Sequence, residues 1–573
     1  MRRWKILLVV LVAFSVLAVY GIVWIRRGAA GEPSSFEKVV ARTARNLAIP
    51  LRARAEKNPV IATPEVLQEA RNVFLDRCAV CHGHDGSGET QIGRNLYPKP
   101  PDLRAAQTQD LSDGELRYII QNGVRLTGMP AWASAHQQLG DDSWKLVLFI
   151  RDLRALTPQE KSAQAATIAS AHYIGSQACE HCHAQIYARW RKTPMANVVR
   201  DPRQYPDAII PDLATNTVAK FSKDQIAFVY GGVWKQRYFT KVGDDYFPLG
   251  AQWDVVHKKW LPYFVKPGTD WWEPYYPADN MQRPTGPTCD GCHSVGYDIR
   301  TKHVAEWNVG CERCHGPGSD HVGNPTRGNI LNPARMDYVR ANDVCIQCHS
   351  QGRPLKNPIE GAPGEHRYYD WPVGYNVGLN LADFWQLEDH TLGESTFTHY
   401  ADGTAHKNRM QGNDFVQSVM YRRGIACFDC HDVHGTENYA QLRKPANQLC
   451  LDCHGPMSLY GPQTATLEEH THHKLARPGE PGQLDDRALA DFPGAPNSSG
   501  QPTGDCIACH MPKIQTTLPG IYVRAHTFSV ITPVMTDRYK IPNPCTQCHA
   551  GKSTVWATAA LRQWPEVSSW RVQ

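Results

Sequence analysis

The sequence has no basic tract, no internal repeat of fixed period and no cysteine outside one recurring motif. Lys and Arg number 61 against 56 Asp and Glu, a formal net charge of +5. Without a basic tract, this mild excess predicts no nucleic-acid partner. Because no cysteine is left over, the 18 cysteines of the chain give no sign of structural disulfides.

The cysteines form nine Cys-x-x-Cys pairs, and a histidine follows every pair although only 25 of the 573 residues are histidine. In such a motif the two thiols add to the vinyl groups of one haem, and the histidine binds its iron. Zinc knuckles, thioredoxin-like pairs and disulfides are the alternatives, and the invariant histidine disfavours them. The sequence therefore predicts nine covalently bound c-type haems. The expected haem-binding residues are Cys78, Cys81, His82, Cys179, Cys182, His183, Cys289, Cys292, His293, Cys311, Cys314, His315, Cys345, Cys348, His349, Cys427, Cys430, His431, Cys450, Cys453, His454, Cys506, Cys509, His510, Cys545, Cys548 and His549.

An apolar run, residues 6–25, has about the length that a helix needs to cross a hydrocarbon core. Three basic residues precede the run, and Arg26 and Arg27 follow it, which favours an N-terminus in the cytoplasm. A cleaved signal peptide is the alternative, although its apolar core would be shorter. We expect an uncleaved transmembrane helix anchored in the lipid bilayer. Under either interpretation the rest of the chain faces the periplasm or another extracytoplasmic space, where c-type haem is attached.

Composition and motif positions divide the chain into five segments. Residues 1–30 are expected to form the anchor or signal, and residues 31–60, polar and basic with no strong period, a tether. Residues 61–156 carry the first motif, residues 157–172 look like a linker, and residues 173–573 carry the other eight motifs. The predicted fold is mainly α with long loops, plus a small β-hairpin region that turns at Gly243 and Asp244.

The first motif has features of its own. A helix that begins after Thr63 leads into it, and a second helix is expected at residues 142–153. Met129 lies 47 residues after His82, between Gly and Pro, where its thioether can be the sixth iron ligand and raise the reduction potential. A methionine that only fills the core is the alternative. With the GHDGSG stretch and the GMPAW loop in this order, residues 62–155 resemble a class I mono-haem cytochrome c.

The other eight motifs lack such a methionine loop, so a second histidine is the expected sixth ligand of their haems. Sixteen histidines lie outside the motifs, which exceeds the need. The candidates are His321, His434, His526 and one of His470, His472 and His473, taken here as His472. Weaker candidates are His172, His257, His399 and His406. His434 lies three residues after His431, a position that resembles paired-motif multihaem cytochromes, in which such a histidine binds a neighbouring haem.

Short spacings indicate close haems. Cys289 and Cys311 are 22 residues apart, and Cys427 and Cys450 are 23 apart. The segments CERCHGPGSDHV, DVCIQCHSQG, CIACHMPKI and IPNPCTQCH, within residues 172–550, resemble the octahaem family that includes hydroxylamine oxidoreductase and octahaem tetrathionate reductase. The resemblance implies an α-rich octahaem body with mostly bis-histidine haems, and it says little about activity.

Two functions follow as hypotheses. The first is an electron carrier of a respiratory chain, whose partners would be a quinol-oxidising membrane complex, a soluble cytochrome, or a terminal oxidase or reductase. The alternative is an oxidoreductase for nitrite, hydroxylamine or tetrathionate at one five-coordinate haem. In the related nitrite reductases, one motif ends in Lys instead of His. No motif of this chain does, which removes one sign of an enzyme without excluding an enzyme. Candidate groups above an open iron are Arg409, Tyr421, Arg422 and Arg423, with pairing to haem propionates as their simpler role.

Overall fold

The chain divides into two compact units, residues 1–155 and 156–573, each described here by itself. The computed structural model describes residues 4, 34–83, 85–88, 90, 93, 96–132, 142–153, 171–263, 283–326, 328–355, 369–455, 466–473, 506–515, 522–549, 551–565 and 567.

The N-terminal unit is helical. Its helices are α2 (Ser35–Ala48), α3 (Leu51–Ala55), α4 (Pro64–Arg77), α5 (Ala79–His82), α6 (Ala106–Gln109), α7 (Asp113–Asn122) and α8 (Asp142–Asp152). Helix α4 begins as expected, with the Thr63 side chain accepting a hydrogen bond from the Val66 amide. Helices α4 and α8 pack together, and the rings of Phe74 and Phe149 lie 5.0 Å apart in the core between them.

Residues 34–55 differ from the expected tether, because they form α2 and α3. Ser34 and Glu37 cap α2 reciprocally, a signal that the sequence carries. Helix α3 packs on α7, where Gly114 leaves no room for a side chain beside the Ala53 carbonyl. Such short helices are marginal alone, so these contacts with the rest of the unit account for them.

The C-terminal unit contains one sheet of five antiparallel strands, in the order β1-β2-β3-β4-β5. The predicted hairpin is confirmed, since Val242 pairs with Asp245 across Gly243 and Asp244. The strands are β1 (Val199–Arg200), β2 (Phe228–Gly231), β3 (Lys235–Val242), β4 (Asp245–Asp254) and β5 (Lys259–Pro262). Three small two-stranded sheets are β6 (Ser294–Val295) with β7 (Glu306–Trp307), β8 (Gly352–Pro354) with β9 (Trp385–Leu387), and β10 (Lys513–Gln515) with β11 (Tyr522–Arg524).

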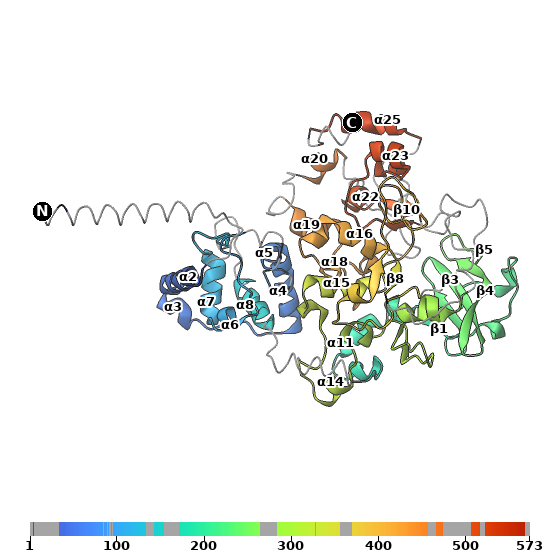
Figure 1. Ribbon diagram of the computed structural model, residues 1–573, viewed down its shortest axis with the longest axis horizontal. Coiled ribbons are helices and arrows are strands. Elements are labelled where there is room, and N and C mark those ends of the chain that lie inside the picture. The colour runs from blue at the N-terminus through green and yellow to red at the C-terminus, as the bar shows by residue number, and fades with distance from the viewer. Residues whose placement is uncertain are drawn as a thin grey trace. The chain divides into compact units, whose positions relative to one another are not determined.

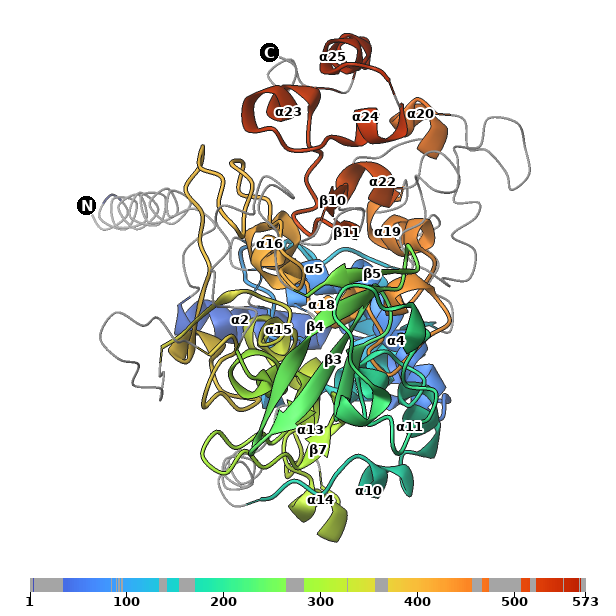
Figure 2. The same ribbon diagram turned by 90° about the vertical axis from the view of Figure 1, so that its right-hand side faces the viewer.

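The helices of this unit are short; the longest described, α15 and α19, have nine residues each. In both views, α14 lies at one end of the unit and α23 and α25 at the other (Figures 1 and 2). The α-helices are α10 (Gln177–Glu180), α11 (Ala184–Trp190), α12 (Gly291–His293), α13 (Glu312–His315), α14 (Ser319–Gly323), α15 (Tyr338–Ile346), α16 (Gln411–Gln417), α17 (Val419–Arg422), α18 (Cys427–Cys430), α19 (Ala446–His454), α20 (Leu467–Thr471), α22 (Cys506–His510), α23 (Pro533–Tyr539), α24 (Pro544–Cys548) and α25 (Thr554–Leu561).

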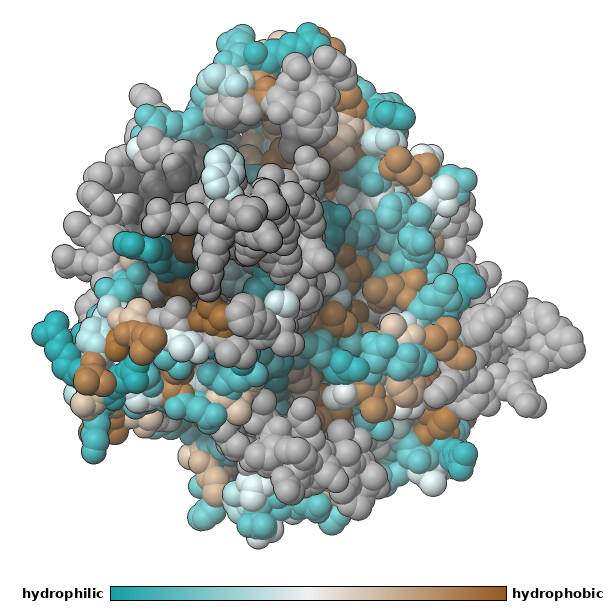
Figure 3. Space-filling model, turned by 60° about the vertical axis from the view of Figure 1, so that its left-hand side comes forward, coloured by the Kyte–Doolittle hydropathy of each residue, from teal (hydrophilic) through white to brown (hydrophobic). Residues whose placement is uncertain are grey.

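The apolar side chains of this unit gather in several small clusters. Motif cysteines belong to them: Cys292 is part of the cluster of Trp371, and Cys314 packs against the cluster of Leu331. On the face drawn in Figure 3, hydrophobic residues lie scattered among hydrophilic ones. Separate apolar clusters with motif cysteines at their edges are expected if porphyrin rings fill the space between the clusters.

Among the described residues, no helix has the length and apolar character needed to cross a bilayer. The predicted anchor, residues 6–25, lies outside the described residues, as does most of the predicted linker.

Glu312 fastens the start of the C-terminal unit to the motif at Cys311. Its buried carboxylate accepts hydrogen bonds from the amides of Ile174, Gly175 and Gly318, at 2.7–3.1 Å. In Glu312→Gln, the amide NH₂ group would face amide N–H donors. We expect a loss of roughly 1–3 kcal/mol in the free energy of unfolding, measured by denaturant titration of the haem-loaded protein. Glu394→Gln, at an exposed position, is the control, and equal stability of the two variants would contradict this role.

Candidate haem-binding sites

The motifs lie on single helical turns. The amide of the motif histidine donates to the carbonyl of the first cysteine, at 3.0 Å in the Cys78 and Cys311 motifs and at 2.9 Å in the Cys179 and Cys345 motifs. This turn holds two thiols and one imidazole on a short rigid piece of backbone. The arrangement fits attachment of one porphyrin by two thioethers beside an axial histidine.

In the N-terminal unit, Cys78 and Met129 pack against the same hydrophobic cluster. Burial lowers the pKa of His82 to about 4, and the Pro101 backbone opposes this shift. The Met129 loop is closed by the Val124 amide, which donates to the Met129 carbonyl at 3.1 Å, and by the Met129 amide, which donates to Thr127 Oγ1 at 3.1 Å. A neutral imidazole and a fixed thioether in one core fit the two axial ligands of a haem.

In the C-terminal unit, four motif histidines each lie opposite a second imidazole. The centres of the two rings are 6.2 Å apart for His315 and His434, 6.5 Å for His431 and His526, 6.2 Å for His510 and His470, and 6.0 Å for His549 and His473. The planes of the first three pairs are within 8–23° of parallel.

This spacing fits two imidazoles on opposite sides of one metal ion. A metal–imidazole bond is about 2 Å long, so two such rings on one ion hold their centres roughly 6 Å apart. Rings in direct stacking contact would lie closer. The four pairs therefore fit bis-histidine haem irons.

The other ring nitrogen of these histidines is also held. The Nδ1 atoms of His315, His431 and His526 lie 2.8 Å from the Leu331 carbonyl, 2.9 Å from the Ala440 carbonyl and 2.9 Å from the Arg524 carbonyl, respectively. A carbonyl at Nδ1 fixes the tautomer that leaves Nε2 for a metal, as is usual for ligating histidines.

One predicted ligand, His472, faces a tryptophan, and a second, His321, stays a candidate. His472 stacks on the indole of Trp564, with ring centres 4.4 Å apart, whereas His470 and His473 face motif histidines. The backbone of His472 is left-handed, with φ 53°, which turns its side chain away from those of its neighbours. His321 is held through Nδ1 by Asn329 Oδ1 at 3.0 Å and lies close enough to His315 to act on its charge.

His399, a weaker candidate, has the features of a ligand. It is fully buried, and its Nδ1 lies 3.0 Å from Thr398 Oγ1. Within the described part of the chain, its Nε2 atom has no hydrogen-bond partner. The same pattern of a held Nδ1 and a buried Nε2 fits coordination of an iron.

Thiols of different motifs lie close together. Four pairs of thiols are near enough to shift each other's pKa: Cys179 with Cys311, Cys292 with Cys348, Cys345 with Cys427, and Cys450 with Cys506. Three further pairs of motifs are close enough for their thiols to interact electrostatically: Cys314 with Cys345, Cys430 with Cys453, and Cys509 with Cys545.

These contacts order the eight motifs. Seven motifs form a row, which runs, by the first cysteine of each motif, Cys179, Cys311, Cys345, Cys427, Cys450, Cys506 and Cys545. The Cys289 motif joins this row at the Cys345 motif. The row of motifs begins at α10 and ends at α24, which lie at opposite ends of the unit (Figure 2).

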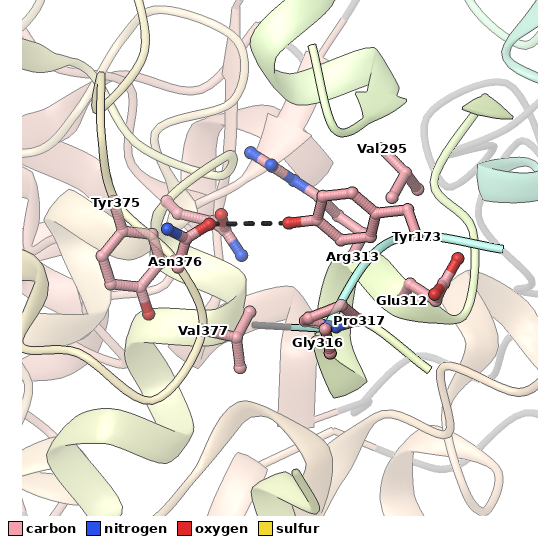
Figure 4. A pocket seen from close by; sticks show the side chains of 11 residues that line it. Tyr173, Val295, Glu312, Arg313, Gly316, Pro317, Tyr375, Asn376 and Val377 are labelled. Atoms are coloured by element: carbon pink, nitrogen blue, oxygen red, sulfur yellow. Dashed lines mark hydrogen bonds between the residues drawn. The ribbon is translucent and has the colours of Figure 1, made fainter. Parts of the chain in front are cut away.

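A cavity of about 170 Å³ lies where the Cys289, Cys311 and Cys345 motifs meet. Its walls include Val295, Arg313, Gly316, Gln347 and Tyr375 (Figure 4). Across the cavity, the Tyr173 hydroxyl lies 3.5 Å from Asn376 Oδ1. The walls combine apolar side chains with the Glu312 carboxylate, the Arg313 guanidinium and the Tyr173 phenol, and the guanidinium and phenol would suit a haem propionate.

Four cationic side chains lie around the Cys289 motif. Alternate positions of β3 place Lys235 and Arg237 on one face. Burial lowers the pKa of Lys235 well below its usual value, with Arg237 and Lys407 adding to the shift. Burial likewise lowers the pKa of Lys407 to about 8, with Arg409 among the contributing charges.

Arg409 reaches the motif itself. Its Nη1 lies 3.8 Å from Cys292 Sγ, and its Nη2 donates to the Asp370 carbonyl at 2.9 Å. The ring beside His293 is the phenol of Tyr230, with centres 5.7 Å apart, and the Tyr230 hydroxyl donates to Asp290 Oδ1 at 2.7 Å.

Of the groups predicted to lie above an open iron, Arg409 lies beside the Cys289 motif. Tyr421 instead packs on Tyr338, at 5.4 Å between ring centres, and Arg423 acts on the charge of His454. Sequence reasoning missed Lys235, Arg237 and Lys407. The alternation of Lys235 and Arg237 in a strand was their one visible signal.

Comparison with known proteins agrees with this chemistry. The family model "Cytochrome C oxidase, cbb3-type, subunit III" matches residues 65–150, "Cytochrome c554 and c-prime" matches residues 276–316, and "Doubled CXXCH motif" matches residues 421–459. With the nine motifs, these matches identify the chain as a multihaem c-type cytochrome. Its N-terminal unit is a helical cytochrome c domain.

Three curated relatives match parts of the chain. Multiheme cytochrome MtrA of Shewanella baltica is 25% identical over 150 residues, 25% of this chain and 41% of the relative. Dissimilatory sulfite reductase MccA of Wolinella succinogenes is 22% identical over 371 residues, 50% of this chain and 51% of the relative. Cbb3-type cytochrome c oxidase subunit FixP of Rhizobium meliloti is 36% identical over 92 residues, 16% of this chain and 28% of the relative. The chain thus spans about half or less of the length of these relatives.

The His315–His434 pair gives a test of axial ligation. In His434→Gln, one haem iron should lose its second imidazole and change from low spin to high spin. Electron paramagnetic resonance of the oxidised protein should then show one additional high-spin centre per chain. His303→Gln, at an exposed position, should leave the spectrum unchanged. An unchanged spectrum for the His434 variant would contradict the pairing.

Proposed function

We propose that the chain is a nine-haem cytochrome that transfers electrons on the extracytoplasmic side of a membrane. The observation that carries the proposal is the closeness of successive motifs through the C-terminal unit, whose thiols act on one another's pKa. When bound, each haem supplies an iron that cycles between the ferric and ferrous states. The protein holds neighbouring attachment sites close enough for electrons to pass from one to the next.

The assigned imidazole pairs support a relay. We assign His434, His526, His470 and His473 as sixth ligands of the haems at Cys311, Cys427, Cys506 and Cys545, and Met129 as the ligand in the N-terminal unit. An iron with two protein ligands undergoes little change of coordination on reduction. Six-coordinate irons therefore suit electron transfer.

The motif at Cys179 is the proposed exchange point with a redox partner. It stands at one end of the row of motifs. Its Cys182 and His183 are exposed, whereas Cys292 in the Cys289 motif is buried. We propose a membrane quinol-oxidising complex, a soluble cytochrome, or a terminal oxidase or reductase as the partner. The Met-ligated haem should have the higher potential, so electrons would run from the octahaem unit toward the N-terminal unit.

Attachment to the bilayer through residues 6–25 is part of the proposal and rests on the length and flanking charges of that run.

The number of haems tests the proposal. Intact-mass spectrometry of the chain matured in a cytochrome c-producing host should show nine covalently added haems. Replacement of both cysteines of one motif by serine, for example Cys179→Ser with Cys182→Ser, should remove one haem and leave eight. A wild-type mass with free or disulfide-bonded cysteines would contradict the assignment.

The cations at the Cys289 motif favour a second candidate function, reduction of a small oxyanion at that haem. Four basic side chains, Lys235, Arg237, Lys407 and Arg409, lie near this site, and the two guanidinium groups keep their charge. Asp370 and Glu388 lie near Lys407, and the Asp370 carboxylate pairs with Arg283 at 3.2 Å. A bound anion would raise the pKa of the two lysines and would be held by their protonated side chains together with Arg237 and Arg409. The similarity to a protein named as a sulfite reductase supports this candidate.

Lys407→Gln tests the second candidate. With a reduced viologen dye as the electron donor, we expect turnover of sulfite or nitrite to fall about a hundredfold, since under this proposal a hydrogen-bond donor to the reacting anion would be lost. Lys220→Gln, at an exposed position, should keep full turnover. Wild-type protein that reduces neither anion would refute the enzyme and leave the electron carrier standing.

A further inference from the structure

The side chain of Gln351 lies between two of the predicted haem sites. Gln351 is the second residue after the Cys345 motif and is 7% exposed. Its Oε1 accepts hydrogen bonds from Lys407 Nζ at 3.3 Å and from Arg409 Nη2 at 3.4 Å. Both partners are among the basic side chains near the Cys289 motif. Gln351 therefore connects the Cys345 motif to the cations at the Cys289 motif.

The backbone of Gln351 is fixed on both sides. Its amide donates to Asn413 Oδ1 at 2.9 Å. Its carbonyl accepts from Asn413 Nδ2 at 3.0 Å and from the Glu388 amide at 2.9 Å. Asn413 is itself buried in α16. The side-chain amide of Gln351 thus extends from a rigid support.

The two cations are also held by neutral groups. Arg409 Nη2 donates to the Asp370 carbonyl at 2.9 Å, and Lys407 Nζ lies 4.4 Å from the centre of the Phe397 ring. Together with the Gln351 oxygen, these contacts orient the cations without neutralising them. A protonated lysine has three N–H donors, so Lys407 can bind a further acceptor.

The nitrogen of the Gln351 amide points to where that acceptor would lie. Lys407 and Arg409 are donors only, so the amide oxygen faces them and the nitrogen occupies the other position. Within the part of the chain that the structure describes, the buried Nε2 has no hydrogen-bond partner. A buried N–H group is costly without an acceptor, and an acceptor beside two cations would be an anion.

We propose that Gln351 is a binding residue of an oxyanion site at the Cys289 haem. Its Oε1 holds Lys407 and Arg409 in place, and its Nε2 donates to an oxygen of the bound anion. The proposal rests on the second candidate function, reduction of a small oxyanion at this haem. A haem propionate offers the same acceptor chemistry, and the experiment separates the two sources.

Nitrite binding to the oxidised, haem-loaded chain tests the proposal, with the haem absorbance as the signal. Gln351→Glu keeps an acceptor for both cations but replaces the N–H donor by an anionic oxygen. Gln351→Met removes the whole amide without adding charge. We expect both variants to bind nitrite roughly tenfold more weakly or worse, since a buried hydrogen bond to an anion is lost. Binding of carbon monoxide, a neutral ligand, to the reduced chain should stay unchanged.

Gln386→Glu adds the same charge at an exposed position of β9 and is the control, which should bind nitrite like the wild type. Unchanged nitrite binding in both Gln351 variants would overturn the proposal and leave the amide to a haem propionate. Weaker binding in Gln351→Glu alone would also overturn it, because the added charge would then be the cause. An equal loss of carbon monoxide binding would show general damage and contradict a role in anion binding. Wild-type chain that binds neither nitrite nor sulfite would overturn the reductase candidate together with this proposal.

Discussion

The fold depends on haem attachment to short helical turns. Apart from the five-stranded sheet, the described part of the C-terminal unit has helices of nine residues or fewer, three two-stranded sheets and several small apolar clusters, and motif cysteines lie in or against those clusters. Such elements bury too little apolar surface to form a stable domain without further contacts. The covalently held porphyrin rings would fill the space between clusters and join them. We therefore regard folding and haem attachment as coupled, as metal binding and folding are in small metal-binding domains.

The same constraint arranges the sites in space. A histidine that follows one motif faces the histidine of another, as His434 faces His315, so each such iron would tie two distant segments together. The closeness of their thiols then places the motifs in a row, which the Cys289 motif joins at the Cys345 motif. Most of the row suits electron transfer. Basic side chains gather at the Cys289 motif, which joins the row at Cys345, and under the second proposal a small anion would be bound and reduced there.

The sequence was sufficient for the local chemistry. Every motif, the Met129 loop, the start of α4 and the hairpin turn at Gly243 follow from short patterns, because a few adjacent residues determine them. The pairing of imidazoles does not, because His434 and His315 are separated by more than a hundred residues. Among His470, His472 and His473, only the left-handed backbone at His472 shows which two face motif histidines. Lys235 and Arg237 looked like ordinary polar positions of a hairpin, and the charge around them comes from a distant loop.

The central claim is that nine irons are held by the nine motifs, with eight of them in one branched row. Anomalous diffraction at the iron absorption edge from crystals of the matured protein tests it most directly. The account predicts nine iron peaks, each beside a motif histidine, with four of them midway between the paired imidazoles and the Cys289 iron next to that of Cys345. Fewer peaks, or irons away from the motif histidines, would contradict it.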